Sequence, residues 1–153
     1  MASEDIVPAS TFRDWSAEYD RAVIDTAARR EAPVLLHAHG YRIHWDVILE
    51  YQAAAFSWHD RGDGASLSDV RRRSGRAVLG GLDERALVAP DTSLVIAQLD
   101  DCLAQTAGLG WIASAGCVAP QAFNPINLLA IAEHLQQAPS TTHVAPAGQT
   151  ESC

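Results

Sequence analysis

Four short apolar runs alternate with amphipathic stretches along the chain. Each run is too short for an ordinary helix, and continuous apolar runs of this length are typical of strands buried on both faces of a parallel sheet. The runs occupy residues 33–38, 53–57, 76–80 and 110–114. We therefore predict four strands.

The stretches around these runs carry the spacing of amphipathic helices. The first has an apolar stripe that begins at Phe12. Ser66 stands three residues before Asp69, as in a capping box, and Asn124 precedes Pro125, the order expected of an N-cap and a first helical position. The predicted helices span residues 11–30, 42–51, 66–73, 91–106 and 124–137.

This alternation of strands and helices predicts an α/β fold with a parallel sheet. A chain of 153 residues is expected to form one domain with a substantial core. We predict a lead-in over residues 1–9 and a folded domain over residues 10–137. Residues 138–153 are rich in Pro, Ser, Thr and Ala without periodicity, which predicts a disordered tail.

The composition narrows the classes of partner. The formal net charge of −8 disfavours nucleic acid or an anionic membrane as the main partner. Neither a signal peptide nor a membrane-spanning run is visible, so we expect a cytoplasmic protein. Three cysteines are too few and too scattered for a disulfide framework. Each cysteine is therefore expected to be a free thiol.

Ligand-type residues follow the predicted strands, where α/β folds carry their chemistry. His37 and His39 are two residues apart, so on a strand their side chains share a face. With Cys117, which follows the last strand, they form a candidate three-ligand zinc site with an open fourth position. The alternative is that both histidines bond to neighbouring loops while Cys117 is a small buried hydrophobe.

A second candidate cluster, Trp-His-Asp-Arg, follows the second strand at residues 58–61. His59 is suited to act as a general base or a donor to substrate, and Arg61 is suited to clamp a carboxylate. The alternative is structural: Asp60 and Arg61 fix the loop, and Trp58 belongs to the core. The sequence leaves these two interpretations equally open.

Three segments together resemble the C-terminal half of the uroporphyrinogen decarboxylase superfamily, collinearly over about residues 8–137. The turn GGLD at residues 80–83 resembles the family's GxLDP segment, with Glu84 instead of the proline. It adds Asp83 to the candidate catalytic residues His59, Asp60 and Arg61. The three segments are FRDWSAEYDRAVIDTAARREAPVLLHAHG, WHDRGDGASLSDVRRRSGRAVLGGLDE and GWIASAGCVAPQAFNPINLLAIAEHL.

The resemblance implies a TIM-type (β/α)8 barrel, of which this chain would supply about four C-terminal βα units. Such barrels need about 250 residues, so 153 residues are too few to close one. We expect either a truncated chain that lacks its N-terminal half or a half-barrel that pairs as a homodimer, which would cover its open sheet edges.

The superfamily implies two chemistries. Its decarboxylases remove acetate carboxyls from a tetrapyrrole of haem synthesis without a cofactor, and their last strand ends in Gly-His-Gly, where this chain has Gly116-Cys117-Val118. Its methyltransferases pass a methyl group from a corrinoid protein to a thiol. They bind zinc through a His-x-Cys pair and a final cysteine, which correspond here to His37-x-His39 and Cys117.

Three functions remain open at this stage. The first is an enzyme domain with a zinc-type site suited to methyl transfer to a thiol, whose partners would be a small-molecule substrate and a corrinoid protein. The second is a decarboxylase-like carboxy-lyase that needs no metal. The third is a non-catalytic half-barrel remnant or interaction module.

Overall fold

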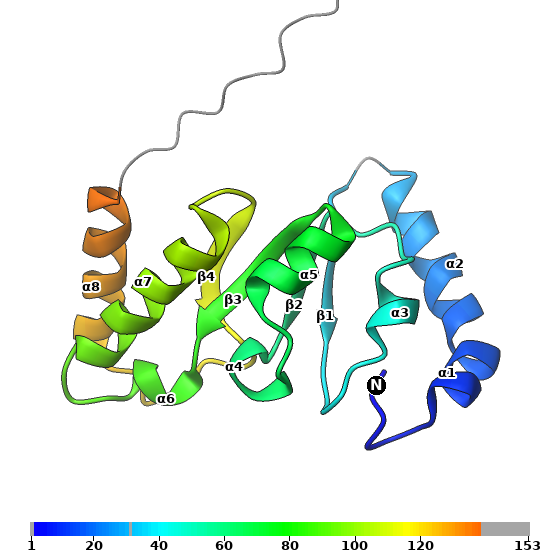
Figure 1. The fold of residues 1–153 in the computed structure, drawn as a ribbon, viewed down its shortest axis with the longest axis horizontal. Helices are drawn as coiled ribbons and strands as arrows, with labels where there is room; N and C mark the ends of the chain where they lie inside the picture. Colours follow the sequence, from blue (N-terminus) through cyan, green and yellow to red (C-terminus); the bar gives the residue numbers. More distant parts are fainter. Residues whose placement is uncertain (1, 31, 139–153) are drawn as a thin grey trace, which may run out of the picture.

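The computed structural model describes residues 2–30 and 32–138, so the predicted tail beyond residue 138 lies outside the described residues. Helices and strands alternate through most of this range (Figure 1). Their order is α1 (Ala9–Trp15), α2 (Ala17–Ala28), β1 (Leu35–Ala38), α3 (Trp45–Ile48), β2 (Ala55–Trp58), α4 (Asp60–Asp63), α5 (Leu67–Ser74), β3 (Ala77–Leu82), α6 (Glu84–Leu87), α7 (Ser93–Thr106), β4 (Trp111–Ala115) and α8 (Pro125–Gln137).

The four strands form one sheet in the order β1-β2-β3-β4, and every neighbouring pair is parallel. The prediction of an α/β fold with a parallel sheet is therefore confirmed. Each apolar run contributes a strand, although the strands are displaced by up to two residues from the runs. A parallel order places the carboxyl ends of all four strands along one edge, which positions the site described below.

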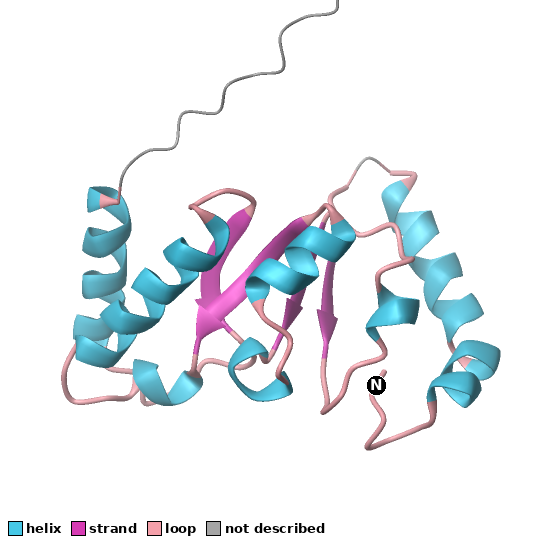
Figure 2. Ribbon diagram, viewed as in Figure 1, coloured by secondary structure: helices cyan, strands magenta, loops and turns pink. Residues whose placement is uncertain are grey.

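The helices cover one face of this sheet, with α5 and α7 in front of it in Figure 2. On that face Phe56 and Val78 are fully enclosed beneath Leu67 of α5. The ring of Trp58 meets Trp45 of α3 edge to face, with centroids 5.0 Å apart. Burial of these large apolar side chains stabilises the packing of the short helices on the strands.

A second group of apolar side chains forms a core on the same face of the sheet, at the end with β3 and β4. Leu82 ends β3 among Leu87 of α6 and Val95 and Leu99 of α7, all of them buried. Asn127 of α8 is the buried polar member of this region. Its Nδ2 donates to the carbonyl oxygens at the end of α6, and this joins α8 to α6.

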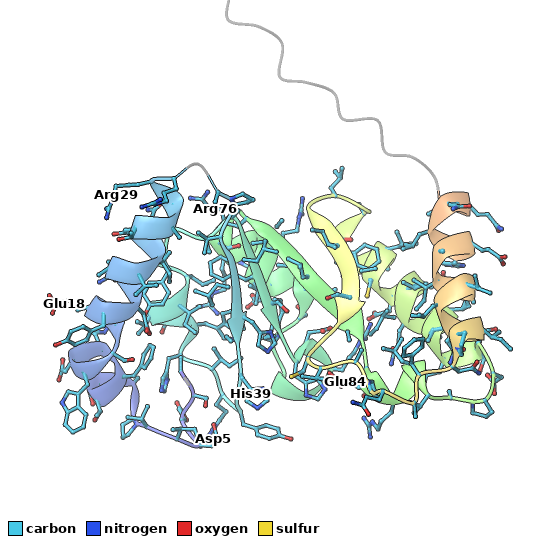
Figure 3. All side chains as sticks on the ribbon, turned by 180° about the vertical axis from the view of Figure 1, so that it is seen from behind. Asp5, Glu18, Arg29, His39, Arg76 and Glu84 are labelled. Carbon is cyan, nitrogen blue, oxygen red and sulfur yellow. The ribbon has the colours of Figure 1, made fainter. Side chains whose placement is uncertain are left out.

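The opposite face of the sheet departs from the prediction that all strands are buried on both faces. That prediction was wrong for β1 and β4, where Leu35 is 58% and Ile112 51% exposed. The view from behind shows no helix of the described chain over the strands (Figure 3). Because the helices of residues 2–138 pack on one face only, this second face, which includes Leu35 and Ile112, is open. We call it the open sheet face.

Helix boundaries confirm the predicted caps and correct two predicted lengths. Ser66 accepts a hydrogen bond from the N–H of Asp69, and Asn124 accepts one from the N–H of Ile126. The predicted helix over residues 11–30 is instead divided, because Ser16 departs from helical geometry with φ −116°. Within residues 42–51 only the four residues of α3 are helical.

The apolar stripe of the first predicted helix is only partly buried. Phe12 lies in the core, but Trp15 is 76% exposed, and Tyr19 and Val23 are also exposed. The kink between α1 and α2 turns Ala17 toward the core in their place. No helix in the described residues combines the length and the apolar character needed to cross a lipid bilayer.

Asn127→Ala is expected to lower the free energy of unfolding by about 2 kcal/mol, because it leaves buried carbonyl groups without a donor. The carbonyl oxygens concerned are those of Ala86, Leu87 and Ala89, at 3.0, 3.2 and 3.0 Å from Nδ2. Urea denaturation measures the loss. The control, Gln136→Ala on the exposed surface of α8, should change stability by less than about 0.5 kcal/mol. Equal stability of both variants would contradict this assignment.

Candidate functional site

The carboxyl ends of the four strands meet along one edge of the sheet, as parallel pairing requires. His39 follows β1, His59 follows β2, Asp83 follows β3 and Cys117 follows β4 by two residues. Residues from distant parts of the sequence therefore share one edge. Figure 3 shows His39 and Glu84 at this same end of the molecule.

Three predicted metal ligands come together at this edge. One nitrogen each from His37 and His39 and the sulfur of Cys117 all lie within 4.8 Å of one another. Nδ1 of His39 is 3.7 Å from Sγ of Cys117. The two imidazole rings are tilted by 37° with centroids 6.3 Å apart. We call these three residues the His-His-Cys cluster.

The side chain of His37 is positioned by the neighbouring strand. Its Nδ1 lies 3.1 Å from Oγ of Ser57, its register partner in β2. Partial burial, together with the charge of His39, lowers the pKa of His37 below its ordinary value. Both effects favour the neutral imidazole, which is the form that binds a metal ion. A proton on Nδ1 donated to Ser57 leaves Nε2 as the free ligand atom.

The His-His-Cys cluster fits a zinc ion in the chemistry of its donors and in its size. Imidazole nitrogen and thiolate sulfur are both zinc ligands, and three protein ligands leave a fourth position open. Ligand atoms about 2.0–2.3 Å from a tetrahedral zinc ion are about 3.3–3.8 Å from one another. The sulfur–nitrogen distance of 3.7 Å already lies in that range. The widest separation, at most 4.8 Å, would need to shrink by about 1 Å.

His59 contacts a carboxylate that the sequence analysis missed. Its Nε2 is 3.1 Å from Oε2 of Glu84, the first residue of α6. Glu84 is largely buried, and its other oxygen, Oε1, has no hydrogen-bond partner among the described residues. Glu84 also stands where the resemblance expected a proline. That departure was the one sequence signal for this contact.

Asp60 lies beneath the site and joins two strands. Its side chain is only 3% exposed, and Oδ1 accepts a hydrogen bond from the N–H of Gly81. Burial raises the pKa of Asp60, and the bond from Gly81 and the charge of Arg61 oppose that rise. A Cβ atom on Gly80 would lie 2.7 Å from the carboxylate of Asp60. Glycine is therefore required for this close approach.

Arg61 extends from the same loop to α7. Its guanidinium donates to the carbonyl oxygens of Gly81 and Gln98 and to the carboxylate of Asp101. Its Nη2 also lies 3.3 Å from Sγ of Cys102. The structure thus shows the loop-fixing contacts of Arg61. Its role as a clamp for a substrate carboxylate stays a prediction.

Asp83 caps the short helix α6. Its Oδ1 accepts a hydrogen bond from the N–H of Arg85, and the guanidinium of Arg85 binds both carboxylate oxygens. Arg85 lowers the pKa of Asp83, so the carboxylate is held in its charged form. These contacts engage the carboxylate within its own turn. A catalytic role for Asp83 stays a prediction.

Two cavities flank the His-His-Cys cluster. One of about 380 Å³ lies between α2 and β1, where His37 and His39 meet apolar side chains such as Ile24. The other, of about 280 Å³, is lined on the opposite side by His39 and His59 together with Asp5, Ile6, Gly40, Tyr41 and Gly62. We call the second one the His39–His59 cavity. It is large enough for a small molecule between the two histidines.

Comparison with known protein families gives one match. The family described as uroporphyrinogen decarboxylase (URO-D) matches residues 2–138. A search of curated proteins gave no match. The family match covers all four strands and every residue of the site described above.

The two described cysteines are expected to differ in reactivity toward iodoacetamide. Burial raises the pKa of Cys102 to about 11, so roughly one thiol in a thousand is ionised at about pH 8. Cys117 is partly exposed and should be alkylated first. Peptide mass spectrometry of the native, metal-free protein measures both sites, and the same reaction in urea is the control, in which the difference should disappear. Equal rates in the native protein would contradict the prediction.

Proposed function

The chain belongs to the uroporphyrinogen decarboxylase family, and we propose that it is an enzyme domain whose metal site serves methyl transfer to a thiol. The observation that carries this proposal is the gathering of the ligand atoms of His37, His39 and Cys117 within 4.8 Å of one another. Family membership supports an enzyme domain of this superfamily. The donor set supports the choice of zinc.

In this proposal His37, His39 and Cys117 hold zinc, and the fourth position is open to substrate. Zinc, when bound, lowers the pKa of a thiol and favours the nucleophilic thiolate. Ser57 orients His37 through the contact with Nδ1. The His39–His59 cavity, of about 280 Å³, receives a small thiol beside the cluster. A corrinoid protein that approaches the carboxyl edge of the sheet is the proposed methyl donor.

We further propose that the sheet is part of a closed barrel, in which a partner covers the open sheet face. We propose that the four strands are half of a TIM-type (β/α)8 barrel, completed by an N-terminal half or by a second copy of this chain. The exposed Leu35 and Ile112 support this, as do the outer edges of β1 and β4. A cytoplasmic location completes the proposal.

The second candidate function is a decarboxylase-like carboxy-lyase, which the description of the matching family favours. In that reading His59 faces a carboxylate substrate in the His39–His59 cavity. The sulfur of Cys117 close to His39 favours the zinc proposal instead, because a thiol beside two imidazoles is a metal-ligand arrangement.

Zinc content tests the first proposal. The wild-type chain should hold about one zinc ion, and Cys117→Ser should lose most of it, because a hydroxyl is a much poorer zinc ligand than a thiolate. Metal analysis after size-exclusion chromatography measures both. Cys153→Ser, which removes a cysteine outside the described residues, is the matched control and should keep its zinc. A folded wild type free of zinc would contradict the metal site.

Substrate tests separate the two candidate functions. The zinc-loaded chain is expected to methylate 2-mercaptoethanol when methylcobalamin is supplied, and Cys117→Ser is expected to lose most of this activity. Fluorescence titration with uroporphyrin should show no saturable binding. Tight uroporphyrin binding by a zinc-free chain, without methyl transfer, would favour the carboxy-lyase.

A further inference from the structure

The proposed function gives no role to the contact between His59 and Glu84. The Glu84 side chain is 18% exposed, and its Oε1 is buried without a hydrogen-bond partner among the described residues. Leaving a carboxylate oxygen in this state is costly. Such a group is retained more readily where it stabilises a positive charge, and His59 is the group that its other oxygen contacts.

The geometry of the pair leaves one nitrogen of His59 for chemistry. Nε2 lies 3.1 Å from Oε2 of Glu84, so a proton on Nε2 is donated to the carboxylate. That hydrogen bond selects the tautomer in which Nδ1 carries the lone pair. Nδ1 lies beside Gly62, where a Cβ atom would be only 3.1 Å away. The absence of a side chain at Gly62 leaves open the space beside this nitrogen.

The imidazole of His59 lies close to the segment that carries Cys117 and shares a cavity with His39 of the His-His-Cys cluster. His59 and His39 both line the cavity of about 280 Å³. Gly116, which precedes Cys117, packs against His59, since a Cβ atom there would lie 3.1 Å from Cα of His59 and 3.2 Å from Cδ2. A molecule in this cavity therefore contacts both His39 of the cluster and His59.

The other carboxylates near His59 accept hydrogen bonds from groups other than His59. Asp83 is bound by Arg85, and Asp60 accepts from Gly81. On the far wall of the cavity, Asp5 accepts a hydrogen bond from the N–H of Tyr41. Glu84 is therefore the carboxylate in direct contact with the imidazole of His59.

We propose that His59 and Glu84 are the proton-accepting pair for a small thiol substrate bound in the His39–His59 cavity. The S–H bond of the thiol breaks, and its electron pair stays on sulfur. The proton forms a new bond to Nδ1 of His59, and the carboxylate of Glu84 stabilises the resulting imidazolium. This inference rests on the proposed function, because it needs the thiol beside the His-His-Cys cluster. His59 acts on substrate, and Glu84 is a positioning residue.

Proton counting by titration calorimetry tests the pair. Zinc-loaded protein is titrated with 2-mercaptoethanol at about pH 7.5, where free imidazole is neutral and free thiol is protonated. The dependence of the heat on the ionisation enthalpy of the buffer gives the protons released. The wild type should release almost none, because His59 keeps the proton. His59→Gln should release about one proton per thiol bound, and Glu84→Gln should release clearly more than the wild type.

Two further variants test whether a change in the proton count comes from Nδ1 of His59. Gly62→Ala crowds Nδ1 of His59 without changing charge, and Gly62 lies in α4 with φ outside the left-handed region, so alanine fits the backbone there. It should raise the proton count toward one. His134→Gln is the matched control, because His134 forms a similar pair with Asp100 on α7, 2.8 Å apart. It should behave as the wild type.

The outcomes separate the two proposals. Zinc-loaded wild type that binds the thiol and releases a full proton, as His59→Gln does, overturns the inference and leaves the proposed function standing. Wild type that retains no zinc, or zinc-loaded wild type that does not bind the thiol, overturns the proposed function and the inference with it. Retention of the proton by the wild type and by His134→Gln, but not by His59→Gln, supports the inference.

Discussion

Parallel hydrogen bonding between neighbouring strands is the constraint on which the site depends. Because β1, β2, β3 and β4 all run in one direction, each strand delivers the residues after it to the same edge. Cys117 comes within 3.7 Å of His39 although 78 residues separate them in sequence. A reversed strand would carry its ligand to the opposite edge. The chemistry of this chain is thus organised first by strand direction.

A partly buried polar network fixes the loops at that edge. The carboxylate of Asp60 holds the N–H of Gly81, and Arg61 ties the same loop to α7 through Asp101. These contacts join two strand ends and one helix. They also set the position of His59, the residue just before Asp60. The two residues beside His59 therefore act as its structural support, whatever His59 contacts in solution.

The features that could be predicted from sequence are those that depend on residues close together in the chain. The helix caps at Ser66 and Asn124 depend on residues two or three positions further along the chain. The strands depend on short apolar runs. Metal-ligand residue types at the strand ends singled out the His-His-Cys cluster. The contact of His59 with Glu84 could not be predicted, because it depends on where β3 ends and α6 turns. The exposure of Leu35 could not either, since an apolar run does not show what covers it.

The place of His37 on β1 connects the cluster with the open sheet face. Side chains two residues apart on a strand share a face, so His37 lies on the same side as the exposed Leu35. Anything that covers Leu35 also encloses His37 and changes its solvation. By thermodynamic linkage, a partner that binds this face more tightly when the ligands hold a metal ion must raise the affinity for that ion by the same factor. Metal supply would then regulate assembly, and assembly would regulate retention of the metal.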